Sequence, residues 1–146
     1  MSALDRYFTL PSLAKKAWAA GAIEKARGYA QELLGDAVAH RDWNNGNAIH
    51  DGNMVLGLVA LHDVDSVRAG SLLIESGKTT GSPQLDSFGP NMTLAKALLQ
   101  KGEKEVVLEY FALCRSFWKM GSAELDEWSA TVRGGGVPSF GHNLLF

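Results

Sequence analysis

The sequence feature that most constrains the fold is a helical spacing of apolar residues that is interrupted several times, each time by a break of one residue. Leu13 and Ala17 share one face of a helix, and a second apolar stripe begins directly after Gly21. Because almost no residues join the two helices, they must lie antiparallel. The same plan recurs with breaks at Asp63, 42 residues later, and at Gly102, after a further 39 residues. Such a near-regular period is typical of helical hairpins that stack on one another.

These patterns predict one all-α domain of about seven helices, built from antiparallel hairpins. The expected elements are three hairpins, a terminal helix and a docked apolar tail, at about residues 12–40, 47–76, 91–119, 122–133 and 134–146. Ser12, which follows Pro11, is the expected N-cap of the first helix. The stretch 78–90 holds two prolines and two glycines and is predicted to be irregular.

Composition and charge exclude several functional classes. The chain has 146 residues, with 14 Lys and Arg against 16 Asp and Glu, and a net charge of -2. This balance supplies neither the basic face that nucleic acid requires nor a polybasic membrane signal. No segment approaches the roughly 20 apolar residues of a membrane helix, and the start lacks the apolar region of a signal peptide. We therefore expect a cytoplasmic protein without nucleic-acid or membrane partners.

The single cysteine, Cys114, lies in an apolar run. One cysteine excludes an internal disulfide and a multi-cysteine zinc site. We expect Cys114 to pack as a small hydrophobic side chain.

Three short segments resemble the tetratricopeptide-like helical-repeat proteins, including uncharacterised bacterial ones. They are Ala17–Ala26, with its small residues, glycine turn and Glu-Lys-Ala start, then Leu56–Leu61 and Ala95–Gly102. The resemblance implies hairpins stacked as a short right-handed superhelix that binds a protein or peptide partner. The period is near 40 residues rather than the roughly 34 of that family, and its closing proline is absent. A plain helical bundle therefore stays an alternative.

The densest group of polar and aromatic residues lies between Asp42 and Asn53. Trp43, Asn47, His50 and Asn53 are its candidate binding residues. Asparagine and histidine side chains can both donate and accept hydrogen bonds, so a face carrying them suits a polar ligand or a peptide backbone. The alternative is structural: the asparagines cap a helix, and His50 bonds a neighbouring carbonyl.

A second candidate region is the long loop 79–91, because long ordered loops are often functional. Gln84, Phe88 and Asn91 are its candidate residues, lining a groove beside the next helix. Its apolar members, Leu85 and Phe88, are expected to pack on the body of the protein. The alternative is a structural plug between two hairpins.

The sequence contains no motif for catalysis or for metal binding. His50 and Asp51 could form half a metal site, but no histidine has another at the helical spacing that such sites use. We expect no metal, no cofactor and no catalytic residue. The leading hypothesis is a protein- or peptide-binding adaptor or scaffold. Two alternatives stay open: a small-ligand-binding protein or enzyme around His50 and Asn53, and a structural protein that forms homo-oligomers.

Overall fold

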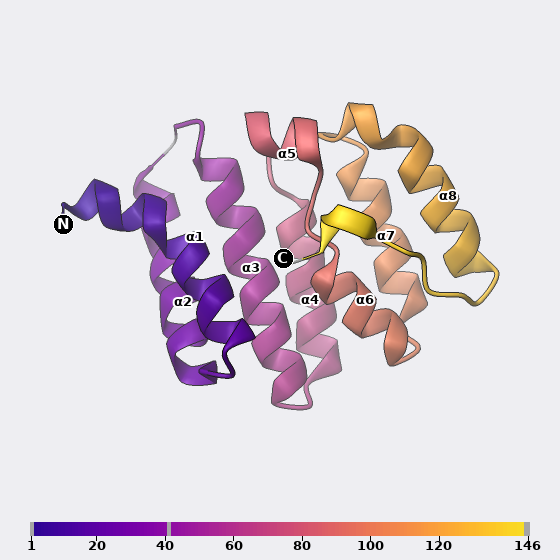
Figure 1. Ribbon diagram of the computed structural model, residues 1–146, viewed down its shortest axis with the longest axis horizontal. Helices are drawn as coiled ribbons and strands as arrows, with labels where there is room; N and C mark the ends of the chain where they lie inside the picture. Colours follow the sequence, from indigo (N-terminus) through magenta and orange to yellow (C-terminus); the bar gives the residue numbers. More distant parts are fainter. Residues whose placement is uncertain (1, 41, 145–146) are drawn as a thin grey trace.

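The computed structural model describes residues 2–40 and 42–144, and this part of the chain is all-α, as the sequence predicts (Figure 1). It holds eight α-helices and two 3₁₀ turns, and no β-strand occurs among the described residues. The elements are α1 (Ala3–Ala19), α2 (Ile23–Ala39), α3 (Asn45–His62), α4 (Ser66–Gly77), α5 (Pro83–Phe88), α6 (Thr93–Gln100), α7 (Lys104–Cys114), η1 (Lys119–Gly121), α8 (Ser122–Arg133) and η2 (Gly141–Asn143). None of these helices is both long and apolar enough to cross a bilayer.

Three hairpin turns close in the same way, between α1 and α2, α3 and α4, and α6 and α7. Each turn places one residue at positive φ: Gly21 at 78°, Val64 at 60° and Gly102 at 82°. The next backbone N–H donates to a carbonyl five residues earlier, from Ala22 to Ala17, from Asp65 to Ala60 and from Glu103 to Leu98. This is the Schellman closure, which satisfies the last carbonyls of a helix. The second break therefore lies at Val64, one residue after the predicted Asp63.

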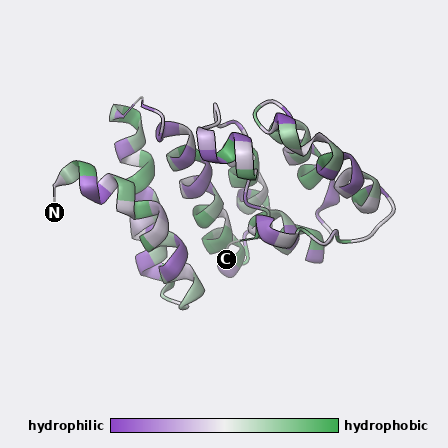
Figure 2. Cartoon of the chain, turned by 45° about the horizontal axis from the view of Figure 1, so that its top comes forward, coloured by the Kyte–Doolittle hydropathy of each residue, from purple (hydrophilic) through white to green (hydrophobic). Residues whose placement is uncertain are grey.

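The helices pack side by side along the molecule (Figure 1). α1 contacts α2, α2 contacts α3, α3 contacts α4, and α4 contacts α7, while α6 bridges α3, α4 and α7. α3 is hydrophilic at its N-terminal end and largely hydrophobic along the rest (Figure 2), where Met54, Val55 and residues 58–60 are buried. Gly57 allows α6 to approach closely, because a Cβ there would lie 2.2 Å from Leu94 Cδ2.

The first helix starts earlier than predicted. α1 begins at Ala3 rather than after Ser12, and Ser2 caps it by accepting the Asp5 N–H at 3.1 Å. The additional turns form because Tyr7 and Leu10 are fully buried in a cluster with residues of α2 and α3. α1 continues through Pro11 and bends along its length (Figure 1), as expected where a proline removes one backbone hydrogen bond.

The prediction that residues 78–90 contain no regular element is wrong. α5 forms there, with Pro83 in its first turn and the Ser82 hydroxyl accepting the Leu85 N–H at 3.0 Å. A serine followed by proline is a recognised start signal for a helix. α7 ends at Cys114, earlier than the predicted end near 119.

The C-terminal tail packs onto the body of the protein. The ring of Phe140 is buried and meets the ring of Trp128 edge-on, with centroids 4.9 Å apart. Leu144 packs against the main core, whereas Leu145 and Phe146 lie outside the described residues. Cys114 is fully buried, as expected, and burial raises the pKa of its thiol well above the usual value.

Candidate functional site

An open groove of about 600 Å³ lies between α1, the N-terminal end of α3, α5 and the C-terminal tail. It brings together two regions that are distant in the sequence. Six of the seven candidate residues line it: Trp43, Asn47, His50, Gln84, Phe88 and Asn91. The seventh, Asn53, is absent from the lining, and its amide donates to the carbonyl of Ile49 within α3 at 2.9 Å.

One wall of the groove comes from α1, and the sequence analysis missed it. Phe8, Pro11, Ser12 and Lys15 line the groove and recur at helical spacing. The prediction that the helix starts at Ser12 leaves Phe8 outside the helix and therefore outside this face. The sequence feature that indicates the longer helix is Ser2, an N-cap residue three positions before Asp5.

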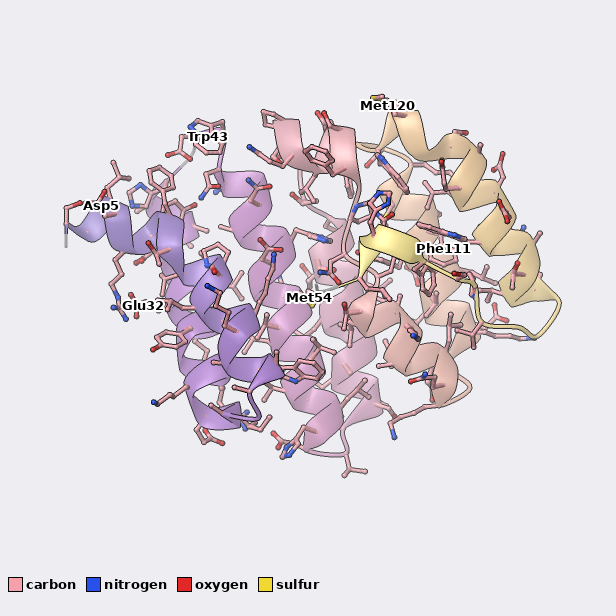
Figure 3. All side chains as sticks on the ribbon, in the orientation of Figure 1. Asp5, Glu32, Trp43, Met54, Phe111 and Met120 are labelled. Atoms are coloured by element: carbon pink, nitrogen blue, oxygen red, sulfur yellow. The ribbon has the colours of Figure 1, made fainter. Side chains whose placement is uncertain are left out.

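Exposed aromatic side chains border the groove on two sides. Trp43 is 57% exposed, and its ring stacks on that of Phe8, which is 40% exposed, with centroids 5.7 Å apart and planes 17° apart. Figure 3 shows Trp43 along the same upper edge of the molecule as α5. Phe88 is 68% exposed, so the expectation that it packs on the body is wrong, whereas Leu85 is buried as expected.

The loop that carries Trp43 is held by the next residues along the chain. The Asn45 amide donates to the carbonyls of Ala37 and His40 at 2.8 and 2.7 Å. Asn44 is the N-cap residue of α3, but its side chain makes no capping hydrogen bond. Asn45 therefore ties the start of α3 to the end of α2, which fixes the position of this wall.

Asn47 joins α3 to α5. Its amide donates to Oδ1 of Asn44 at 3.0 Å and to Oε1 of Gln84 at 3.1 Å. Its own Oδ1 accepts the hydroxyl of Ser82, the residue that caps α5. Both ends of the Asn47 amide are thus engaged, and Asn47 positions Gln84 at the groove surface.

His50 forms part of the groove floor and is 1% exposed. Its Nε2 accepts the backbone N–H of Asn91 at 2.9 Å, and its Nδ1 lies 3.1 Å from the carbonyl oxygen of Ser76. Because Nε2 must accept, the ring is the neutral tautomer that donates from Nδ1. Burial lowers the pKa of His50 below its ordinary value.

This geometry leaves His50 no free nitrogen for proton transfer or for a metal. Both ring nitrogens contact backbone groups, as in the structural alternative above. Among the described residues, no three His, Cys, Asp or Glu side chains are grouped as metal ligands. The two hydrogen bonds of His50 instead connect α3 to the end of α4 and to the segment before α6, and so fix the floor of the groove.

Asn91 and Asn143 fix the far side of the groove. Oδ1 of Asn91 accepts the Thr93 N–H at 2.8 Å, and its carbonyl accepts the Tyr110 hydroxyl at 2.8 Å. The amide of Asn143 donates to the carbonyls of Phe88 and Pro90 at 3.0 and 3.1 Å. Sequence reasoning missed Asn143, because no local pattern marks a tail residue that bonds a loop 53 positions earlier.

The charged groups of the groove compensate each other. Lys15 Nζ lies 3.0 Å from Asp51 Oδ1, and both side chains are largely shielded from solvent. The other titratable lining residues are the buried His50 and the exposed His142. The described lining of the groove is therefore mainly aromatic and amide-rich.

No protein-family model matches this chain, and comparisons with curated proteins and with solved structures find no match. The geometry of the groove is therefore the basis on which a function can be assigned.

Proposed function

We propose that this protein is a peptide-binding helical-repeat module that acts as an adaptor or scaffold. In this proposal, the groove holds an extended segment of a partner protein. The observation that carries it is the convergence of two separated polar and aromatic regions, around Trp43 and around Phe88, on one open groove.

The size and character of the groove support a peptide ligand. A volume of about 600 Å³ lies within the usual range for binding clefts. Aromatic side chains are enriched at binding surfaces, and tryptophan is over-represented among the few residues that provide most of the binding free energy. Phe8, Trp43 and Phe88 are exposed together around a single groove, unlike apolar residues scattered singly over a surface.

The repeat character also supports this proposal. The turns at Gly21, Val64 and Gly102 share one backbone geometry, and the next helix starts two residues after each. We propose that the hairpins stack in a tetratricopeptide-like, right-handed manner. Helical-repeat proteins commonly bind partners along extended surfaces of this kind.

The enzyme alternative receives less support, because His50 has both ring nitrogens engaged with the backbone. Self-association is favoured by one observation, the exposed pair Phe8–Trp43, which would suit a second copy equally well. Light scattering over a concentration series separates the two ideas. A dimer that Trp43→Ala dissociates would favour self-association over a peptide partner.

The proposal is tested by selecting displayed random peptides on the purified protein and measuring their affinities. We expect the enriched peptides to bind with one-to-one stoichiometry. Trp43→Ala and Phe88→Ala should each weaken binding by about tenfold, the effect of removing a central aromatic contact. Val67→Ala is the matched control, because Val67 is an exposed apolar residue of α4 that does not line the groove.

Peptides that bind wild type and both groove variants with equal affinity would rule out the groove as the site. Failure to enrich any peptide in repeated selections would argue against a peptide-binding function altogether.

A further inference from the structure

We infer that the groove selects a proline-rich segment in the polyproline II conformation. This inference rests on the proposed function and specifies its ligand. It depends on three features of the groove: the aromatic faces, the hydrogen-bonding groups left free, and the charge.

The aromatic faces provide the first argument. Polyproline II segments dock in aromatic-lined grooves, where flat rings pack against the pyrrolidine rings of the ligand. Phe8 and Trp43 form one stacked, exposed surface, and Phe88 is exposed on α5 across the groove. A proline-rich chain is also stiff before it binds, so it loses little conformational entropy on an open surface.

The free hydrogen-bonding groups provide the second argument. Oδ1 of Asn91 is engaged by Thr93 N–H, and Oε1 of Gln84 is engaged by Asn47. The NH₂ groups of both side chains have no hydrogen-bond partner among the described residues, and neither does the indole N–H of Trp43. These side chains therefore offer unused donors to a ligand.

A surface of donors matches a chain of prolines. A proline residue has a backbone carbonyl but no backbone N–H, so it presents acceptors only. An ordinary extended peptide would also bring backbone N–H groups, which the free NH₂ groups of Gln84 and Asn91 and the indole N–H of Trp43 cannot pair with. Leaving such a donor unpaired at a desolvated interface costs binding free energy.

The charge provides the third argument. Lys15 and Asp51 pair with each other, so no lysine, arginine or carboxylate among the described lining residues is left unpaired to attract an acidic or a basic peptide. An uncharged proline-rich segment is the ligand whose chemistry fits the rings and the donors together.

The test compares two blocked decapeptides by titration calorimetry: one of proline, and one of alternating alanine and serine. The proline peptide should bind about tenfold more tightly or better, as expected when rings and donors both contribute. Equal affinity, or a preference for the alanine–serine peptide, would overturn the inference.

Conservative variants test the mechanism of selection. Gln84→Glu keeps the oxygen that accepts from Asn47 but replaces the free donor by an acceptor, so the affinity for the proline peptide should fall by about fivefold. Trp43→Phe keeps an aromatic face and removes the indole donor, and it should weaken binding less than Trp43→Ala does. Val67→Ala should leave the affinity unchanged, and an equal loss in this control would contradict the assigned site.

The two proposals fail in different ways. If selected peptides bind through the groove but lack proline, the ligand class is wrong and the peptide-binding function stands. If neither the selection nor the proline peptide shows binding that depends on Trp43, both proposals fall.

Discussion

The ring of His50 accepts the backbone N–H of Asn91 at 2.9 Å, across 41 residues of sequence. This bond joins α3 to the segment that leads from α5 into α6, and it lies directly beneath the groove. On its other side the ring donates to the carbonyl of Ser76, at the end of α4. One buried imidazole therefore determines how three parts of the chain are placed relative to each other.

Protonation of His50 should destabilise the fold. Burial lowers its pKa in the folded state, opposed by the carboxylate of Asp51 and the carbonyl of Ser76 and assisted by the Lys15 ammonium. The unfolded chain therefore binds the proton at higher pH than the folded one, and this part of the stability is lost as pH falls below about 6.5. The free energy of unfolding should decrease by up to about 1.4 kcal/mol per pH unit there.

Urea denaturation across the pH range from about 7 to 5 measures this effect. His50→Gln should lower the stability at pH 7 and flatten the slope, whereas His142→Gln, at the exposed rim of the groove, should keep the slope of wild type. Parallel slopes in wild type and His50→Gln would show that another group is responsible.

Two glycines in adjacent helices should respond in opposite ways to alanine. At Gly46 in α3, a Cβ would lie 1.8 Å from the carbonyl oxygen of Gly81, so Gly46→Ala must displace the segment before α5. We expect a loss of about 3 kcal/mol, the upper end of the usual overpacking cost. At Gly28 in α2, nothing lies within 4 Å of the added carbon, so Gly28→Ala should stabilise by about 1 kcal/mol through helix propensity. Thermal or urea unfolding compares the two, and loss of stability in both would contradict the geometry.

Val64 should be a site where glycine stabilises the protein. It is a β-branched residue at φ 60° and is 89% exposed, so it bears backbone strain and few packing contacts. Val64→Gly should raise the free energy of unfolding by about 1 kcal/mol, the relieved strain less the added freedom of the unfolded chain. The reverse change, Gly102→Val, places valine in the equivalent turn and should cost a similar amount. A destabilised Val64→Gly protein would show that the valine side chain contributes a contact.

Asn143 should hold the tail on the groove. Asn143→Ala removes the donors to the carbonyls of Phe88 and Pro90, and leaving buried carbonyls unpaired costs about 1–3 kcal/mol. Hydrogen exchange should become faster at Met92, whose N–H donates to the carbonyl of Asn143, while α2 keeps its protection. His142→Ala is the control, and unchanged exchange at Met92 in Asn143→Ala would show that the tail docks through its apolar residues alone.

Sequence reasoning located the groove in part because two of its walls are local features. The segment from Trp43 to His50 and the loop with Gln84, Phe88 and Asn91 are each dense in side chains that bond or stack, and both were identified as candidates. The sequence does not predict that these two regions meet, because neither local pattern specifies which distant residues it will contact. The role of His50 is not predictable from the sequence for the same reason: its partners, Ser76 and Asn91, are 26 and 41 residues away.

The sequence by itself determined the all-α class and the hairpin turns at Gly21 and Gly102, and it located the turn at Val64 to within one residue, because helix periodicity and helix stops arise from neighbouring residues. Only the tertiary structure decided that α1 runs through Pro11 and that Phe8 faces Trp43. Burial of Tyr7 and Leu10 outweighs the hydrogen bond that proline removes, and that burial exists only once α2 and α3 are in place. The groove is a product of these long-range contacts, which no local pattern encodes.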